Sequence, residues 1–259
     1  MNMTQLSDAV LLHQADGVLT ITINRPEVRN AVNGAVSYGV CAGLDELDNN
    51  SSLRVGILTG AGGNFCAGMD LKAFLRGEVT RVGHRGIMGL AYTPPRKPLI
   101  AAVEGYALAG GFEAVLACDL TVAARDAKFG LPEPKRGLAA LAGGLLRLPR
   151  VIPERIAMEL ALTGDLVTAE RLFHFGLVNH LTEPGDALLG AIKLARRIVA
   201  NAPMSVDVSK QVIRRQIDWT ESEMFDRQAD IGGHILRSDD AREGAAAFAE
   251  KREPRWSGK

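Results

Sequence analysis

Short apolar runs alternate with longer amphipathic stretches through the first half of the chain. Two runs, at residues 10–13 and 18–23, flank an Ala-Asp-Gly turn and predict a β-hairpin. Runs at residues 54–59 and 99–103 predict buried strands, and helical spacing from residue 31 to about residue 48 predicts a helix. Strands and a helix joined by short connections indicate an α/β fold with right-handed β-α-β crossovers.

Two of the predicted strands lead into glycine-rich corners, each followed by a helical pattern. The first corner, at residues 60–72, reads GAGGNFCAGMDLK, and the second, within residues 99–120, reads LIAAVEGYALAGGFEAVLACDL. Such a corner presents unpaired backbone N–H groups at the positive end of a helix dipole, where a negatively charged ligand oxygen is stabilised. Glu113 follows one turn into the second helix, in apolar surroundings. A packing turn with a solvated glutamate is the alternative for one isolated corner, but two corners in one chain favour a binding site.

Glycines interrupt the pattern between the two corners. Residues 73–92 show a weaker helical pattern that contains four glycines and ends at Pro94-Pro95. We predict a helix that forms a lid or pocket wall, with an ordinary surface helix as the alternative. His84 in this segment is a candidate substrate contact or, alternatively, a solvated histidine.

Helical patterns dominate after residue 143. Strands are predicted at residues 121–124, 128–130 and 177–181, and helices at residues 143–151, 153–162, 168–175, 186–200, 203–217, 220–237 and 239–251. The chain therefore divides into a core at residues 1–200 and a helical region at residues 201–259. This boundary rests on the Asn201-Ala202-Pro203 segment alone.

Composition and charge exclude several classes of protein. The 259 residues are 47% apolar and 23% charged, which is ordinary for a globular protein with a sizeable core. The formal net charge of zero and the absence of basic runs argue against binding to nucleic acid or to a membrane surface. No run approaches the ~20 apolar residues of a membrane span, and residues 1–10 lack the pattern of a leader peptide, so we expect a cytoplasmic protein.

The cysteines and histidines follow no disulfide or metal-site pattern. Cys41, Cys66 and Cys118 are an odd number, lie far apart and predict reduced thiols. Cys66 lies in the first corner, where we expect a small apolar filler rather than a reactive thiol. The five histidines occur in no metal-binding spacing, and no dinucleotide or phosphate loop is present. We therefore expect no metal and no cofactor.

Three separated segments together resemble one family. FCAGMDLK at residues 65–72, AAVEGYALAGGFEAVLACDL at residues 101–120 and AKFGLPEPKRGL at residues 127–138 are similar, in order and spacing, to motifs of the crotonase (enoyl-CoA hydratase/isomerase) superfamily. The resemblance extends from Asn24-Arg25-Pro26 to the basic C-terminal tail. It implies a crotonase-like spiral of ββα units, with an all-helical C-terminal region that packs on neighbouring subunits of a homotrimer or of a hexamer of two trimers. It also implies an acyl-CoA thioester substrate, of which CoA is a part.

The resemblance assigns a chemical role to four positions. The backbone N–H groups of Met69 and Gly110 match the two donors that stabilise a thioester enolate in this family. Glu113 and Glu133 match the catalytic pair of the family's hydratases, with Glu113 assigned to the water and Glu133 to protonation of the α-carbon. Members with other activities commonly keep one carboxylate of this pair, so the resemblance implies an enoyl-CoA hydratase. Enoyl-CoA isomerase, carnitinyl-CoA-type dehydratase and acyl-CoA hydrolase are alternatives, and a non-catalytic acyl-CoA or RNA binder is an alternative from another class.

Substrate contacts away from the reacting carbons are also implied by the resemblance. The positions that match CoA contacts in the family are Arg29, Ala31, Ala67, Lys72 and Lys251, with Lys251 expected to approach from a neighbouring subunit. A solvated surface charge is the alternative interpretation for each of the basic residues.

One segment departs from the family's pattern. Between Gly137 and Gly144, Ala140 and Leu141 stand where the family's hydratases carry a proline and a glycine. Leu141 is therefore expected to reshape the pocket around the β-carbon. Outside the motif pair, we interpret Glu104 and Glu159 as solvated carboxylates.

Overall fold

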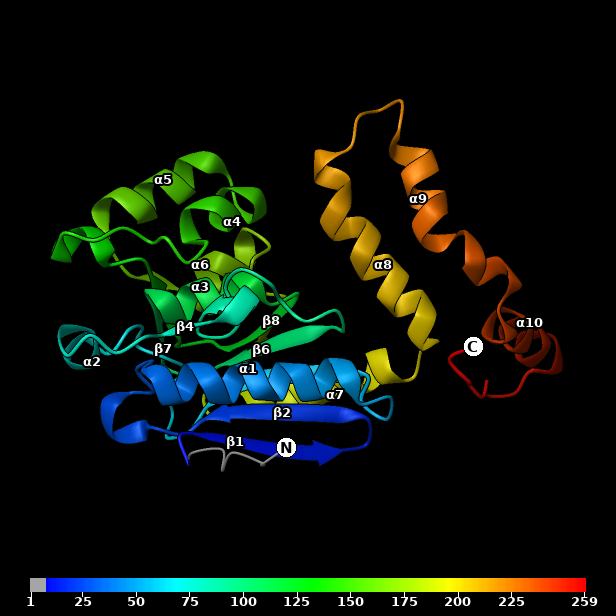
Figure 1. Ribbon diagram of the computed structural model, residues 1–259, viewed down its shortest axis with the longest axis horizontal. Coiled ribbons are helices and arrows are strands. Elements are labelled where there is room, and N and C mark those ends of the chain that lie inside the picture. The colour runs from blue at the N-terminus through cyan, green and yellow to red at the C-terminus, as the bar shows by residue number, and fades with distance from the viewer. Residues whose placement is uncertain (1–7) are drawn as a thin grey trace.

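A six-stranded sheet forms the centre of the chain (Figure 1). The computed structural model describes residues 8–259, so part of the N-terminal segment in which no leader is expected lies outside the described residues. In sheet order the strands are β1 (Val10–Ala15), β2 (Val18–Ile23), β3 (Val55–Gly60), β6 (Leu99–Val103), β8 (Leu120–Ala124) and β11 (His180–Thr182). β1 and β2 form the predicted antiparallel hairpin, and all later neighbours in this sheet are parallel. The predicted α/β class is confirmed.

Two helices pack on opposite faces of this sheet. α1 (Gly34–Asn49), capped by the Asn33 side chain, shares the larger core with Leu58 and Leu99. α7 (Ala187–Val199) shares a smaller core with Ile57 and Ile100. These residues are neighbours along β3 and β6, and successive side chains of a strand point to opposite faces. The fully buried residues of α7 are alanines, so this helix lies close against the strands.

A second, three-stranded sheet adjoins the second glycine corner. It contains β7 (Tyr106–Leu108), β9 (Lys128–Gly130) and β10 (Val167–Thr168), in the order β10-β9-β7. β6, β7 and α3 (Gly110–Ala117) follow one another as a ββα unit, as the resemblance implied. The sequence pattern does not predict β7, because its three residues stand between a glycine and the alanine–glycine turn. Three further helices, α4 (Gly144–Val151), α5 (Glu154–Thr163) and α6 (Ala169–His174), lie at predicted positions.

The helix predicted over residues 73–92 is wrong. α2 (Leu71–Leu75) is a short helix, and a hairpin of β4 (Arg81–Val82) and β5 (Gly86–Ile87) follows it. Gly77, Gly86 and Gly89 have φ values of +75°, +76° and +63°. A right-handed helix requires a negative φ at every residue, so these glycines mark turns rather than weak points of one helix.

A buried arginine fastens this hairpin to α1. The Arg85 guanidinium forms ion pairs with Asp45 and Asp48 at 2.8 and 3.1 Å. Arg85 is buried, whereas His84 beside it is exposed. His84 is therefore a solvated side chain, as the alternative interpretation predicted.

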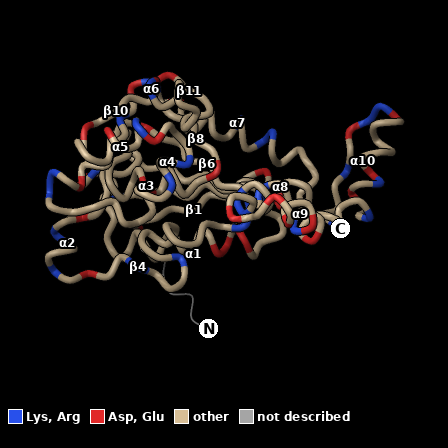
Figure 2. Tube along the Cα trace, turned by 90° about the horizontal axis from the view of Figure 1, so that it is seen from above, with Lys and Arg blue, Asp and Glu red and all other residues tan. Residues whose placement is uncertain are grey.

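The C-terminal helices extend away from the sheet (Figures 1 and 2). They are α8 (Pro203–Arg215), α9 (Met224–Gly232) and α10 (Asp239–Glu250), close to the predicted ranges. Lys210 and Arg214 of α8 form ion pairs with Asp119 at 2.6 and 2.9 Å, which connect this region to the end of α3. Neither α8 nor α9 contains a fully buried residue, although much of α8 is half-buried.

The structure contradicts the expectation for Glu104 and confirms the one for Cys66. Glu104 is not a solvated carboxylate, because its two oxygens accept hydrogen bonds from the N–H groups of Gly185 and Ala187 at 3.1 and 2.8 Å and so cap α7. All three cysteines are free thiols. Burial raises the pKa of the Cys66 thiol to about 12, so it is an inert filler as predicted.

The structure adds two observations on membranes and metals. Over residues 8–259, no helix combines the length and the apolar character that crossing a bilayer requires. In the same part of the chain, no group of three or more His, Cys, Asp or Glu side chains is arranged to hold a metal ion.

Candidate active site

The two glycine corners lie side by side. The Leu108 N–H donates to the Cys66 carbonyl at 2.9 Å, and the Cys66 N–H donates to the Tyr106 carbonyl at 2.9 Å. A Cβ atom on Gly68, which has a φ of +96°, would lie 2.7 Å from Ala109 Cβ and 3.4 Å from the Gly110 nitrogen. Only glycine therefore allows the first corner to approach the second this closely.

This approach brings the two predicted amide donors together. A Cβ atom built on Gly110 would lie 4.0 Å from the Met69 nitrogen. Within residues 8–259, neither the Met69 N–H nor the Gly110 N–H donates a hydrogen bond. Both residues line one cavity of about 290 Å³, which we call the corner cavity. Two unused donors beside one cavity are the arrangement that binds an oxygen with developing negative charge.

Backbone strain at Ala109 aims the second donor. Ala109 precedes α3 with φ +50° and ψ −128°, a conformation that costs a residue with a Cβ about 1–3 kcal/mol. Its N–H is fixed by the Gly130 carbonyl at 2.9 Å, so β9 holds the strained residue in place. The next N–H in the chain is that of Gly110, at the positive end of α3.

Glu113 lines the corner cavity from the first turn of α3. It is 4% exposed, and its Oε1 atom accepts a hydrogen bond from the Gly144 N–H at 2.9 Å. Burial, helped by the negative charge of Glu133, raises the pKa of Glu113 to about 7, although the Gly144 and Ala142 amides and Arg147 act in the opposite direction. Near neutral pH this carboxyl can therefore both accept and donate a proton.

Glu133 lines the same cavity from a neighbouring segment. It follows Pro132, opens a short 3₁₀ helix and is 8% exposed. Burial raises the pKa of this carboxyl, against the effect of its own backbone amide and of Arg136. Its Oε2 atom is buried and has no hydrogen-bond partner in the described part of the chain. A buried acceptor without a partner is costly, unless a ligand or water supplies the missing donor.

The pattern of the sequence did not reveal two residues that act on Glu113, one through a hydrogen bond and one through its charge. Gly144 supplies the amide described above, and the partly buried Arg147 donates to the carbonyls of Ala91 and Ala142 at 2.7 and 3.5 Å. Gly143, with a φ of +107°, lies against the Arg147 guanidinium. The Gly143-Gly144 pair at the start of a predicted helix was the one available signal, because it repeats the form of the other corners.

Leu141, where the sequence departs from the family's pattern, lies at the edge of the corner cavity. Leu141 lines the cavity and is 73% exposed, whereas Ala140 beside it is buried. A side chain with this exposure leaves room for a ligand to displace it.

The structure groups four of the five predicted CoA contacts. The Ala67 N–H donates to the Arg29 carbonyl at 3.0 Å, which places Arg29 and Ala31 along the first corner. Lys72 follows the cavity-lining Leu71 and is exposed. Lys251 lies at the end of α10, and Figures 1 and 2 show α10 at the opposite end of the chain from α2. One chain alone therefore does not bring Lys251 to the corner cavity.

Comparison with known proteins yields one family. A family model described as enoyl-CoA hydratase/isomerase matches residues 13–259. The chain is 41% identical to an enoyl-CoA hydratase of Mycobacterium tuberculosis, over 95% of each protein, and 39% identical to a carnitinyl-CoA dehydratase of Salmonella arizonae, over 98% of this chain and 100% of that protein. It is similar to the crystal structure of an enoyl-CoA hydratase from Mycobacterium marinum, with a TM-score of 0.96, 58% identity and coverage of 98% of this chain and 100% of that one.

The raised pKa of Glu113 predicts a pH-dependent change in stability on its replacement. The carboxyl binds its proton more tightly in the folded chain than in the unfolded one, so stability falls as pH rises from about 4.5 to about 7. Glu113→Gln removes this ionisation. From about pH 4 to about pH 8, we expect the free energy of unfolding of the variant to gain about 3 kcal/mol relative to the wild type.

Denaturant titrations at one fixed protein concentration measure this difference. Glu159→Gln is the matched control, because Glu159 is exposed and its ion pair with Arg171 lowers its pKa. A Glu113→Gln difference that does not change with pH would contradict the assignment of a raised pKa.

Proposed function

The chain belongs to the enoyl-CoA hydratase/isomerase family, and we propose that it adds water reversibly to a trans-2-enoyl-CoA to give a 3-hydroxyacyl-CoA. One observation carries the proposal. Two buried carboxylates with raised pKa values line the same cavity as two unused amide donors. Hydration needs both parts, since it forms an enolate and moves two protons at adjacent carbons.

In the proposed reaction, the amides act on the thioester carbonyl. Its oxygen accepts hydrogen bonds from the N–H groups of Met69 and Gly110, and negative charge grows on that oxygen as the enolate forms. The donors are held by the backbone, so they need no reorganisation during the reaction. In comparable sites each such donor contributes about 10²–10³ in rate.

The two carboxyl groups have opposite tasks in this proposal. Ionised Glu113 takes a proton from water as the oxygen bonds to the β-carbon, and protonated Glu133 delivers a proton to the α-carbon. A pKa near 7 suits Glu113 as the base, and burial favours the protonated form of Glu133. Water addition transfers no electrons, so the reaction needs no redox cofactor.

A dehydratase is the second candidate. The same atoms carry the reverse reaction, and relatives at 37–39% identity are named carnitinyl-CoA dehydratase. The departure at Leu141 favours a substrate that differs from simple enoyl chains near the β-carbon. Mass analysis of the products distinguishes these activities from isomerase and hydrolase chemistry, because isomerisation leaves the mass unchanged and hydrolysis releases free CoA.

A binder without catalysis is less well supported. An RNA binder needs a basic surface. Acidic and basic side chains are instead interspersed along the chain, as Figure 2 shows, and the formal net charge is zero. Shifted pKa values at two carboxyl groups of one cavity favour an enzyme.

Replacement of either carboxyl tests the proposal. In Glu113→Gln and in Glu133→Gln, we expect turnover of crotonyl-CoA to fall about 10²–10⁴-fold, because each variant loses one proton transfer. Binding of a saturated acyl-CoA, measured by calorimetry, should persist in both. Glu170→Gln, at an exposed ion pair with Arg125, is the control with wild-type turnover. Undiminished turnover in both cavity variants would refute the assignment.

Arg147 should set the pH at which turnover is lost on acidification. Its positive charge lowers the pKa of Glu113, so Arg147→Met should move the acidic limb of the kcat/KM profile to higher pH. Arg147→Lys keeps the charge and should leave this limb near the wild-type position. If Arg147→Met lowers turnover without moving the limb, the residue only supports the Ala142 loop.

We also propose that the chain assembles as a homotrimer or as a hexamer of two trimers, with residues 201–259 packed on neighbouring subunits. Leu236 and Phe248 are 85% and 88% exposed in the single chain, which is unusual for large apolar side chains. In such an assembly Lys251, one turn beyond Phe248, reaches the CoA phosphates of a neighbouring subunit.

Phe248→Asp tests this assembly. Light scattering should give the wild type the mass of three or six chains and give the variant a smaller mass, because a charge replaces an apolar contact. Lys193→Asp is the control, because Lys193 is exposed on α7. Arg242→Asp is not suitable, because Arg242 forms an ion pair within α10. A monomeric wild type would exclude the proposed assembly.

A further inference from the structure

A chain of hydrogen-bonded peptide groups connects Arg25 with the donor at Met69. The Gly68 carbonyl and the Met69 N–H belong to one peptide group, and in a trans peptide they point in opposite directions. This carbonyl accepts a hydrogen bond from the Val32 N–H at 2.8 Å. The Ala31 carbonyl, in the same peptide group as that N–H, accepts from the Arg25 guanidinium at 2.6 Å. Two peptide groups therefore lie between a positive charge and an unused donor of the corner cavity.

Asn30 fastens the backbone of Arg25 to the first corner. Its side chain is fully buried, and its Oδ1 atom accepts a hydrogen bond from the Arg25 N–H at 2.9 Å. Its Nδ2 atom donates to the carbonyls of Ala61 and Asn64 at 2.8 and 2.6 Å. The φ of Asn30 is +58°, a conformation that asparagine tolerates better than most residues. The corner that presents the Met69 donor therefore also holds Arg25.

One acidic side chain forms an ion pair with the Arg25 guanidinium. The Asp70 Oδ2 atom lies 3.1 Å from Arg25 Nη2, and Oδ1 accepts hydrogen bonds from the N–H groups of Lys72 and Ala73 at the start of α2. The side chains of Arg25 and Asp70 are 18% and 13% exposed, so water screens their charges only in part. A guanidinium does not lose its proton in proteins, and its charge is therefore present at every working pH.

The two donors of the corner cavity differ in the source of positive potential behind them. The Gly110 N–H lies at the start of α3, which has eight residues and a dipole that favours negative charge at this end. Met69 precedes α2, which has only five residues. A charged donor makes a stronger hydrogen bond than a neutral one, and hydrogen bonds in a chain polarise one another. Arg25 can therefore do for the Met69 N–H what the helix does for Gly110.

We propose that Arg25 is a positioning residue, whose charge acts through the two peptide groups to strengthen the hydrogen bond from the Met69 N–H to the substrate oxygen. This inference rests on the proposed function, because it takes the thioester carbonyl to lie at Met69 and Gly110. A stronger donor stabilises the negatively charged enolate more than the neutral carbonyl of the bound substrate. Loss of Arg25 should therefore lower kcat more than it weakens binding.

Two variants separate this role from a structural one. Arg25→Met and Asp70→Asn both remove the ion pair, but only the first removes the hydrogen bond to Ala31. Asparagine caps a helix as well as aspartate does, so α2 keeps its start in Asp70→Asn. We expect kcat for crotonyl-CoA to fall about tenfold in Arg25→Met, less than loss of a whole donor costs, and to stay near the wild-type value in Asp70→Asn. Binding of butyryl-CoA, measured by calorimetry, should persist in both.

The absorption of a bound conjugated thioester measures the donor directly. Hydrogen bonds to the carbonyl oxygen of sorboyl-CoA draw electrons toward that oxygen and move the absorption to longer wavelength. Glu113→Gln is added to every chain in this experiment, so that the thioester persists. We expect Arg25→Met to reduce the red shift and Asp70→Asn to retain it. Arg125→Met is the matched control, because Arg125 forms only exposed ion pairs.

A second pair of variants guards against misfolding of Arg25→Met. Arg25→Lys keeps the positive charge, whereas Arg25→Gln supplies a neutral donor to Ala31. The red shift should be closer to that of the parent chain in the lysine variant than in the glutamine variant. A larger shift in the glutamine variant would contradict a role for the charge.

Three further results would overturn the inference. Equal losses of red shift in Arg25→Met and Asp70→Asn would mean that the ion pair only holds the first corner in place. An undiminished red shift in Arg25→Met would exclude the connection through the peptide groups. Absence of any red shift in the parent chain would show that the carbonyl does not lie at Met69. A normal red shift without hydration of any enoyl-CoA by the wild type would instead refute the proposed function and leave this inference standing.

Discussion

The pairing of the two glycine corners is the constraint on which the rest of the site depends. Two backbone hydrogen bonds, between Cys66 and the strand β7, hold the first corner parallel to the second. They work only because Gly68 leaves no side chain between them. The amide donors at Met69 and Gly110 come from segments about forty residues apart in the chain, yet backbone geometry alone fixes their relative position. A donor pair built this way tolerates changes of side chain at residue 69.

Burial of the two carboxyl groups opposes folding and supports chemistry. Apolar surroundings raise the pKa of a carboxyl group, and two carboxylates in one cavity repel each other. The Gly144 amide and the positive charge of Arg147 partly offset both effects at Glu113. Gly144 supplies that amide from the start of α4 rather than from α3 itself. The strain at Ala109 has the same character, since it costs stability at the residue that aims the Gly110 donor. Such local costs are concentrated where the ligand binds.

Local patterns and motifs predicted the elements better than their interactions. The strands of the large sheet and the helices after residue 143 were recognisable because each is a continuous apolar or amphipathic run with its own turn or cap. The helix predicted over residues 73–92 is wrong, because hydrophobic periodicity does not show that the glycines of this segment have positive φ. The capping of α7 by Glu104 and the hydrogen bond from Arg147 to Ala91 join segments that are distant in sequence, so no local pattern predicts them. The resemblance located Glu113 and Glu133, but only the fold shows that they share one cavity.

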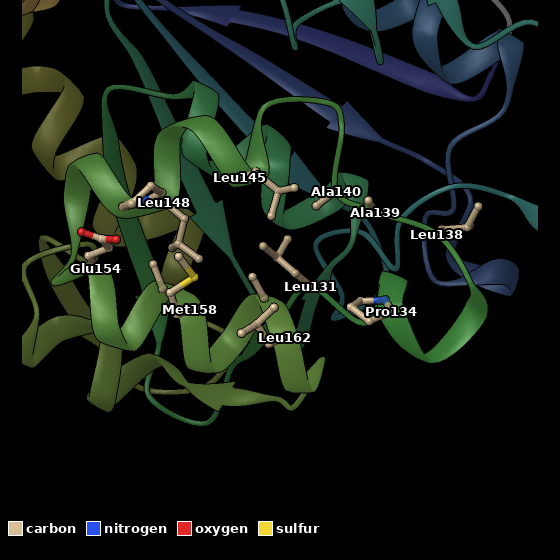
Figure 3. Close-up of a pocket in the computed structure, with 14 residues that line it drawn as sticks. Leu131, Pro134, Leu138, Ala139, Ala140, Leu145, Leu148, Glu154, Met158 and Leu162 are labelled. Atoms are coloured by element: carbon tan, nitrogen blue, oxygen red, sulfur yellow. The ribbon is translucent and has the colours of Figure 1, made fainter.

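The small residues beside Glu113 connect the position of this carboxylate with the shape of the corner cavity. Ala140 and Gly144 bring α4 close enough to hold Glu113, and bulky residues there would push the Gly144 amide away from the carboxylate. Ala140 and Gly144 also line a cavity of about 430 Å³ between α4 and α5 (Figure 3). A proline at residue 140 would stiffen this segment and remove a backbone N–H. The departure at Ala140 and Leu141 therefore lies both at the edge of the corner cavity and in the segment that positions the Gly144 amide, so the shape of that edge and the position of Glu113 cannot vary independently.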